Sequence, residues 1–284
     1  MPINNFKVID SFLQFEQGFF YKFELLVRNT DGSNPLFQEG YSNTNNNILI
    51  KSWYIDTKEY YEKIKHEMVT LADITGARLY VTLDRKDNVK LCQSLIKSYT
   101  DSLVAIVNKQ SPSIKKLSKI FASETSKIEN SSKVTKTIMF DVDTKDIKVL
   151  DALTFYIRNN KEHPYILETK KGYHIFCYKK FNTDNWEQDV VEAFLKEYRK
   201  TTKIVEDLVE LTHLVKEYVS MKPNELGLVY HPLKNEQSFY DKLYNLVEPY
   251  IDDFTGYNEK EQGFDILQAV QEVLESECSR KTLD

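Results

Sequence analysis

The chain has 284 residues, of which 41% are hydrophobic and 29% are charged. This length suffices for a large core in one or two domains, and no run of about eighteen apolar residues marks a membrane span. The formal net charge of -5 argues against broad non-specific nucleic-acid binding, although it leaves room for a local basic cleft.

The first half of the chain alternates between strand-like and helix-like patterns. The strands are rich in aromatic and β-branched residues, and the helices repeat apolar residues at helical spacing. In order, we expect a strand at 19–27, a loop at 29–47, a strand at 48–55, a helix at 57–72, a strand at 77–83 and a helix at 89–107. This alternation predicts an N-terminal α/β module over residues 1–109.

The second half follows a polar segment, residues 110–133, which we interpret as a linker or exposed excursion. The expected elements are a strand at 137–142, a helix at 146–160, strands at 164–168 and 173–178, a helix at 186–214, strands at 215–219 and 226–230 and helices at 239–250 and 263–278. Their order predicts a β-α-β-β-α-β, ferredoxin-like or RRM-like half over residues 134–250. Residues 251–284 are predicted to form a helical C-terminal tail.

Two further features bear on the compartment. Residues 1–7 lack the apolar core of a signal peptide, so we expect a cytoplasmic protein. Cys92, Cys177 and Cys278 are scattered without zinc-type spacing, so neither a structural zinc nor a disulfide framework is expected.

Asp141 and Asp143 stand at the end of the predicted strand at 137–142, after an apolar run. Residues i and i+2 of a strand point to the same face, so the two carboxylates are expected side by side. Carboxylates this close repel each other unless a cation lies between them, and oxygen ligands suit Mg²⁺ or Mn²⁺. An isolated Asp-x-Asp is more often a loop or a helix cap, but its position here favours a metal site.

A second motif, Lys-Lys-Gly-Tyr-His at residues 170–174, occupies the predicted turn before the strand at 173–178. Lys170 and Lys171 would offer positive charge to phosphates, and His174 would add a directional donor. A lone strand histidine is more often structural, and two lysines in a turn are usually only solvated. Beside a metal site, however, these are the groups that nucleotidyl transfer requires.

The two motifs resemble those of the archaeo-eukaryotic primase superfamily, the primase-polymerases. Phe140-Asp141-Val142-Asp143, with Asp146 shortly after, resembles the family's first motif, an apolar strand ending in Asp-x-Asp or Asp-x-Glu. The motif at 170–174 resembles the basic-basic-Gly-apolar-His motif of small primase subunits. It is also similar to a Thr-x-x-Gly-Tyr-His-Ile stretch of small phage-encoded, primase-like proteins. The family fold, an N-terminal α/β module packed on an RRM-like half, agrees with the predicted elements.

The resemblance implies a DNA primase-like, divalent-metal-dependent nucleotidyltransferase that acts in DNA replication. The implied cofactor is Mg²⁺ or Mn²⁺. The implied partners are nucleoside triphosphates, a single-stranded DNA template and a helicase or other replication protein, with no membrane involved. In this family pattern, Asp141 and Asp143 hold the metals, while His174, Lys170 and Lys171 bind the incoming nucleotide.

The family also uses a third carboxylate, which is not obvious in this chain. We favour Glu225 as the third metal ligand over Asp207 and Glu217. Arg78 and Arg85 flank the strand at 77–83 and would line the opposite wall of the cleft, with Arg78 binding the nucleotide. A surface salt bridge is the alternative interpretation of Arg78. The chain departs from the family in lacking a cysteine cluster for a zinc element and in its acidic balance.

Other functional classes remain open at this point. A haloacid-dehalogenase-type phosphatase also has an apolar strand and Asp-x-Asp, but here Lys145 occupies a position that calls for Thr or Val. A 3′-5′ exonuclease calls for Asp-x-Glu and further acids. The non-enzymatic alternative is a catalytically degenerate primase-like module that binds nucleic acid or nucleotide and acts through protein partners. Such a module would be indifferent to Mg²⁺ and Mn²⁺.

Overall fold

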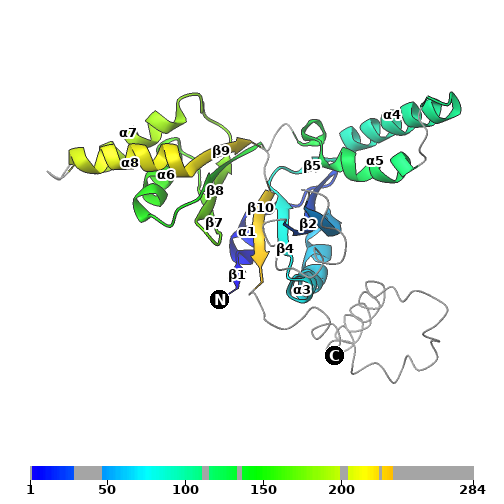
Figure 1. Cartoon of the computed structure of the whole chain (residues 1–284), viewed down its shortest axis with the longest axis horizontal. Coiled ribbons are helices and arrows are strands. Elements are labelled where there is room, and N and C mark those ends of the chain that lie inside the picture. The colour runs from blue at the N-terminus through cyan, green and yellow to red at the C-terminus, as the bar shows by residue number, and fades with distance from the viewer. Residues whose placement is uncertain are drawn as a thin grey trace, which may run out of the picture.

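The computed structural model describes residues 2–28, 47–110, 115–132, 136–198, 204–223 and 226–232. Within these ranges the predicted mixed α/β fold is confirmed, because two antiparallel sheets each pack against helices (Figure 1). The helices expected at 239–250 and 263–278 lie outside the described residues, as do the C-terminal tail and nearly all of the loop at 29–47.

The described strands and helices fall close to the predicted positions in most of the chain. The strands are β1 (Ile3–Asn4), β2 (Phe19–Val27), β3 (Ile48–Ile55), β4 (Arg78–Thr82), β5 (Lys86–Asp87), β6 (Thr137–Val142), β7 (Tyr165–Glu168), β8 (Tyr173–Tyr178), β9 (Val219–Pro223) and β10 (Leu226–His231). The helices are α1 (Phe6–Phe12), α3 (Lys58–Thr75), α4 (Asn88–Val107), α5 (Lys115–Ser126), α6 (Ile147–Asn159), α7 (Trp186–Tyr198) and α8 (Ile204–Tyr218), with a 3₁₀ helix η2 (Ile128–Asn130).

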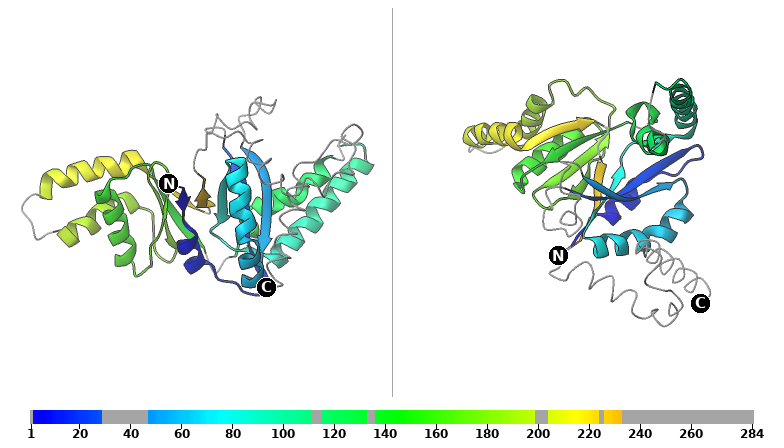
Figure 2. Two further views of the ribbon diagram at one scale, coloured as in Figure 1. Left: turned by 90° about the horizontal axis from the view of Figure 1, so that it is seen from below. Right: turned by 45° about the vertical axis from the view of Figure 1, so that its right-hand side comes forward.

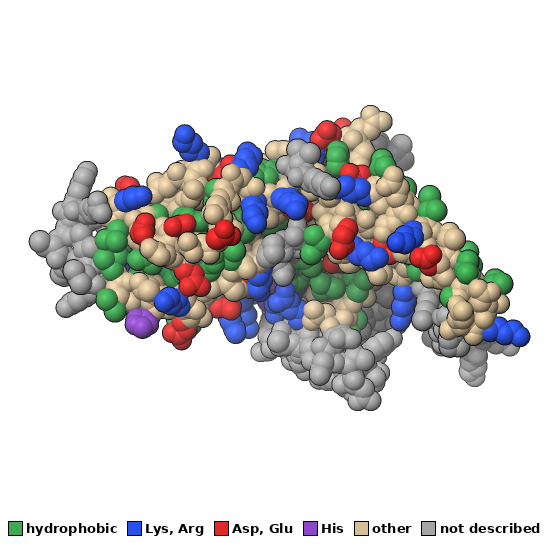
Figure 3. Space-filling model, turned by 90° about the horizontal axis from the view of Figure 1, so that it is seen from above, with side chains coloured by type: hydrophobic (Ala, Val, Ile, Leu, Met, Phe, Trp, Pro, Cys, Tyr) green, Lys and Arg blue, Asp and Glu red, His purple; other side chains and the backbone are tan. Residues whose placement is uncertain are grey.

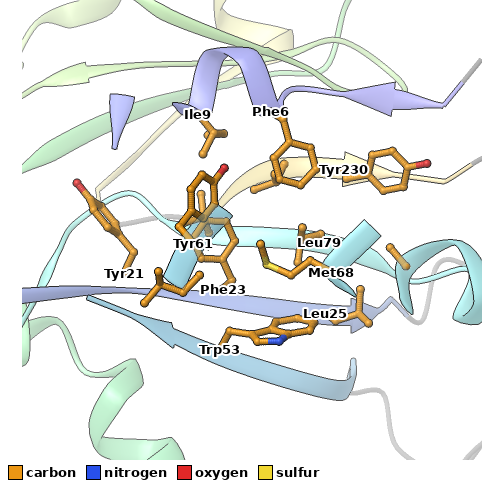
Figure 4. Packing of buried hydrophobic residues seen from close by; sticks show 14 of the residues in the cluster. Phe6, Ile9, Tyr21, Phe23, Leu25, Trp53, Tyr61, Met68, Leu79 and Tyr230 are labelled. Atoms are coloured by element: carbon orange, nitrogen blue, oxygen red, sulfur yellow. The ribbon is translucent and has the colours of Figure 1, made fainter. Parts of the chain in front are cut away.

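The first sheet has the strand order β1-β10-β4-β2-β3, and β5 pairs with β2. Because side chains alternate along β2, Phe23 and Leu25 point into the core. There they pack with Trp53 of β3 and Met68 of α3 (Figure 4). Thr57 caps the start of helix α3, where its side chain accepts a hydrogen bond from the Tyr60 amide, and Gly76 caps the end in the left-handed conformation. One face of the sheet is therefore covered by α3.

The second sheet has the strand order β7-β8-β6-β9. With α6 after β6 and α7 and α8 between β8 and β9, this is the ferredoxin-like order expected for the RRM-like half. Phe140 and Ile175 point from this sheet into a core that contains Val149 and Leu153 of α6. The opposite face of the sheet carries Met139 and Phe176, which belong to the core of the first sheet.

Helix α1 and the residue before it join the two sheets. Phe12 packs edge-on against Phe176 of β8, with ring centroids 4.8 Å apart. The buried side chain of Asn5 donates to the carbonyls of Glu168 and Leu228, each at 2.9 Å, and accepts from the Glu168 amide at 2.9 Å. Because Glu168 lies in β7 and Leu228 in β10, this one amide ties the edge strand β7 of the second sheet to β10 of the first.

Three parts of the fold were not predicted at this detail. Strand β10 returns to the first sheet, where it pairs with β4 and β1, so the range predicted as the RRM-like half supplies a strand to the N-terminal module. The polar segment at 110–133 contains α5, which packs on α4. The strand expected at 215–219 is the last turn of α8, and β9 begins at Val219.

Candidate functional site

Asp141 and His174 lie directly opposite each other on the antiparallel strands β6 and β8. The His174 Nε2 atom is 3.4 Å from the Asp141 Oδ1 atom. Residues two positions away on the same strands, Met139 and Phe176, pack into the core of the first sheet. Since side chains two apart share a face, Asp141 and His174 lie on the side of the second sheet that is turned toward the first.

Lys222 of β9 completes this arrangement from the other neighbour of β6. Its Nζ atom is 2.6 Å from the Asp141 Oδ2 atom. Strand pairing sets Ser220 opposite Asp141 and Lys222 opposite Met139, so the lysine reaches the carboxylate diagonally. The Asp141 carboxylate thus has a histidine on one oxygen and an ammonium group on the other.

Asp143, the second acid of the predicted pair, lies just past the end of β6 and is exposed. Its amide still donates to the Tyr218 carbonyl at 2.9 Å, so the backbone keeps its position beside the sheet. Asp146, which resembles the later acid of the primase motif, accepts from the Lys148 amide at 2.8 Å and caps α6. Its role is therefore structural here.

The imidazole of His174 is buried and uncharged at neutral pH. Burial lowers its pKa to about 4; the charges of Asp141 and Asp143 act against this shift, and those of Arg28 and Lys222 act with it. The Nδ1 atom is buried and makes no hydrogen bond within the described part of the chain. The tautomer with the proton on Nε2 faces Asp141 and leaves Nδ1 as an acceptor.

Arg28 brings the first sheet into this site. It directly follows β2, and its guanidinium carbon lies 4.9 Å from the ring centroid of Tyr80 in β4. Its charge contributes to the lowered pKa of His174, which places it within electrostatic range of the second sheet. The group formed by Asp141, Asp143, His174, Lys222 and Arg28 is called the site cluster below.

Gly172 holds the lysine turn against the acidic strand end. A Cβ atom on this residue would lie 1.8 Å from the Val142 carbonyl oxygen and 2.7 Å from that of Thr144, so only glycine fits. The Gly172 amide donates to the Thr169 hydroxyl at 3.0 Å, and the Thr169 amide donates to the Gly172 carbonyl at 3.0 Å. Lys170 and Lys171, both exposed, are therefore fixed beside the backbone that follows Asp141.

The remaining predicted residues are placed differently. Arg78 is half-buried at the start of β4, opposite Leu26, whereas the arginine that acts on His174 is Arg28. Arg85 is buried and donates to Glu16 at 3.0 Å and to the Gln14 carbonyl at 3.3 Å, which is a structural role.

The three candidates for a third carboxylate lie in different parts of the chain. Glu225 lies outside the described residues, so its prediction as a metal ligand stays a prediction. Glu217 is exposed on the last turn of α8 and not in the strand that was expected there. Asp207 falls within α8, but its side chain is not among those described.

The carboxylates of Asp141 and Asp143 fit a divalent cation that takes most of its ligands from water and substrate. Among the described residues, no three His, Cys, Asp or Glu side chains gather as a metal-binding group. Mg²⁺ in phosphate-binding sites is nevertheless often held by one or two carboxylates together with water and substrate oxygens. Asp141 and Asp143 can supply those carboxylates, provided that the Lys222 ammonium moves away from Asp141 Oδ2.

Lys222 and Arg28 are the two members of the site cluster that were not predicted. Lys222 becomes a candidate only when the register of β9 on β6 is known. Arg28 becomes one only when the approach of the two sheets is known. The available sequence signal was weak: Arg28 directly follows the predicted strand at 19–27, and Lys222 lies between the predicted strands at 215–219 and 226–230.

No protein-family model, curated protein or solved structure matches this chain. Of the helices that the structure describes, none combines the length and the apolar character needed to cross a membrane.

Proposed function

We propose that this protein is a DNA primase-like, divalent-metal-dependent nucleotidyltransferase. Its substrates would be nucleoside triphosphates and a single-stranded DNA template, and it would act in DNA replication in the cytoplasm, beside a helicase or another replication protein. The observation that carries the proposal is the site cluster itself. Asp141, His174 and Lys222 meet on three adjacent strands of a ferredoxin-like sheet, on the side facing Arg28 of the other sheet.

In this proposal the chain's own groups bind and orient the triphosphate. Lys222, Arg28 and the exposed Lys170 and Lys171 supply positive charge to phosphate oxygens. Neutral His174 offers a directional contact without adding charge, because burial keeps its pKa near 4. A Mg²⁺ or Mn²⁺ ion, when bound, would neutralise charge that develops during transfer.

Asp141 would then have a dual role. Without substrate, its carboxylate is neutralised by Lys222 at 2.6 Å. With substrate, phosphate oxygens would compete for the Lys222 ammonium, and Asp141 would be released to accept a cation. This exchange makes metal binding and nucleotide binding mutually dependent.

A second candidate function is a catalytically degenerate primase-like module that binds nucleic acid or nucleotide and acts through protein partners. The observation that favours it is that Asp141 already has both oxygens occupied, by His174 and Lys222. Within the described ranges, moreover, no third acid joins the pair. The two functions differ in whether Mn²⁺ is needed.

Primer synthesis on a single-stranded homopolymer template tests the proposal. The full chain, the complementary nucleoside triphosphate and Mn²⁺ should give products longer than a dinucleotide on a denaturing gel. The Asp141→Asn/Asp143→Asn double variant and the His174→Gln variant should lose them. Asp56→Asn, which alters an exposed carboxylate after β3, is the matched control and should keep full activity. Nucleotide binding without synthesis by the wild-type chain would favour the degenerate module.

A further inference from the structure

Helix α4 projects from the first sheet, on the side away from the second sheet (Figures 1 and 2). Along its 20 residues, Leu91 is its one buried apolar side chain, within the described structure. By contrast, Val89 is 64% exposed, Ile96 69% and Leu103 50%. Figure 3 shows hydrophobic side chains on the surface at this end of the molecule. A projecting helix with several exposed apolar side chains indicates a surface that binds a partner.

The exposed apolar residues follow a heptad repeat. They recur along the helix at alternating intervals of three and four residues, as do the a and d positions of a coiled coil. They are Val89, Cys92, Ile96, Tyr99, Leu103 and Ile106, called the α4 stripe below. All of them are exposed or half-buried. The repeat spans almost the whole helix, which is about 30 Å long.

A different side of α4 already has its partner within the chain. Ser94 and Ser98 both donate to the Glu124 carboxylate of α5, the latter at 2.6 Å. These contacts hold α4 and α5 together as a hairpin and use the polar side of α4. By helical spacing the α4 stripe is turned away from these contacts, and among the described residues no other helix packs along it.

We propose that two copies of this chain associate through antiparallel pairing of their α4 stripes. A two-fold axis midway between Ile96 and Tyr99 sets each a position of one copy beside a d position of the other. Ile96 then meets Tyr99, Cys92 meets Leu103 and Val89 meets Ile106. The stripe is therefore complementary to itself in one register, as an isologous interface requires.

The charges around the stripe favour a second copy over a charged partner. The residues that flank it, Gln93, Leu95, Thr100 and Ser102, are all uncharged. The charged residues Lys90, Lys97 and Asp101 lie on other sides of the helix, by helical spacing. Self-pairing thus sets no like charges opposite each other, whereas an acidic or basic helix would find no counter-charge at the stripe.

The direction of α4 also suits antiparallel pairing. The helix starts next to β5 of the first sheet and runs outward (Figure 1). Antiparallel pairing places the two sheet bodies at opposite ends of the helix pair, where they do not collide. The two site clusters would then face solvent independently of each other.

Sedimentation velocity of the full chain over a range of concentrations tests the proposal. The wild-type chain should sediment as a dimer. An Ile96→Asp/Leu103→Asp variant should be a monomer, with association weakened about 100-fold or more. The control is Val209→Asp on α8, where the side chain is 58% exposed but lies outside the stripe; it should stay dimeric. A monomeric wild-type chain, or a dimer that survives the double variant, would overturn the proposal.

Disulfide trapping tests the register. In a Cys278→Ser background, a Leu103→Cys variant should cross-link rapidly under mild oxidation, because Cys92 of one copy lies beside position 103 of the other. The same background with Leu103 retained should cross-link slowly. Rapid cross-linking through Cys92 alone would indicate parallel pairing and would contradict the antiparallel register, as would an absence of cross-linking in the Leu103→Cys variant.

Discussion

The two sheets each hold a cluster of ionisable side chains, and the clusters differ in how far their members are exposed to solvent. In the first sheet, Lys22, Asp84 and Lys86 are at most 5% exposed. Lys22 binds Glu24 at 2.5 Å, and Asp84 accepts from the amide and hydroxyl of Thr137 at 2.7 and 2.8 Å. Lys86 donates to Ser131 and to the Lys127 carbonyl, both at 3.0 Å.

The site cluster on the second sheet is arranged differently. The side chain of Lys222 is 40% exposed, that of Asp141 is 20% exposed, and Asp143 is open to solvent. A buried charge costs several kcal/mol unless the protein itself supplies its partners. In the first cluster the protein supplies partners to Lys22, to Lys86 and to the Oδ1 atom of Asp84, which joins the end of β4 to the start of β6. The Asp84 Oδ2 atom is buried and makes no hydrogen bond within the described part of the chain. The second cluster keeps charges accessible to a ligand, which is the property of a binding site.

Among the variants that test this difference between the two sheets, Gly172→Ala should have the largest effect on the free energy of unfolding. The Gly172→Ala variant would place a Cβ atom 1.8 Å from the Val142 carbonyl oxygen, and the free energy of unfolding should fall by at least about 3 kcal/mol. Urea unfolding measures it. Gly227→Ala is the control: its Cβ atom would meet Leu83 Cδ2 at 2.8 Å, a side-chain end that can move. If Gly172→Ala is as stable as the control, Gly172 does not lie as close to the Val142 carbonyl oxygen as described.

Asp84→Ala should be next in size. It removes the acceptor for two Thr137 donors and the carboxylate whose charge most favours the charged form of Lys86, so we expect a loss of about 2 to 4 kcal/mol in the free energy of unfolding. Asp143→Ala in the site cluster should change it by less than about 0.5 kcal/mol. If Asp84→Ala and Asp143→Ala lose equal amounts of unfolding free energy, the two clusters do not differ in their contribution to stability.

The pH dependence of stability should reveal His174. Its pKa is about 4 in the folded chain and about 6.5 when unfolded. Between these values the unfolded state binds more protons than the folded state, so stability is complete above about pH 6.5 and falls as the pH drops toward 4. We expect this histidine to account for about 3 kcal/mol. The effect should be absent from His174→Gln, measured by urea unfolding at each pH; identical profiles would contradict a buried, neutral imidazole.

Lys222→Met should have the smallest effect on stability, below about 1 kcal/mol, because exposed ion pairs contribute little. Its effect on ligands should be larger. Without the ammonium at 2.6 Å from Asp141, Mn²⁺ alone should bind about ten-fold more tightly. Nucleotide should bind more weakly, because a phosphate contact is lost. Mn²⁺ affinity from electron paramagnetic resonance separates the two effects, and unchanged Mn²⁺ binding would rule out competition between Lys222 and the metal.

The sequence predicts β6, β7 and β8 of the second sheet well, because their apolar runs are bounded by clear turns, but it places β9 too early in the chain. Strands β6 and β8 have the predicted bounds, and their antiparallel pairing then sets Asp141 opposite His174. The end of α8 was predicted wrongly, since a short apolar run such as 215–219 fits a strand or a helix equally.

The other members of the site cluster depend on contacts between distant segments. Lys222 needs the register of β9, and Arg28 needs the angle at which Asn5 and Phe12 hold the two sheets. The return of β10 to the first sheet is likewise a long-range choice. No local pattern carries such information, so the acids and the histidine could be predicted and their basic partners could not.

Calorimetric titration of the full chain with a nucleoside triphosphate, with and without Mn²⁺, tests the central claim most directly. We expect binding that strengthens in the presence of Mn²⁺ and that Asp141→Asn/Asp143→Asn loses, while Asp56→Asn binds as the wild-type chain does. Binding that ignores Mn²⁺ and survives the double variant would contradict a metal-dependent site at Asp141. Failure of the wild-type chain to bind at all would exclude the site cluster as a nucleotide site.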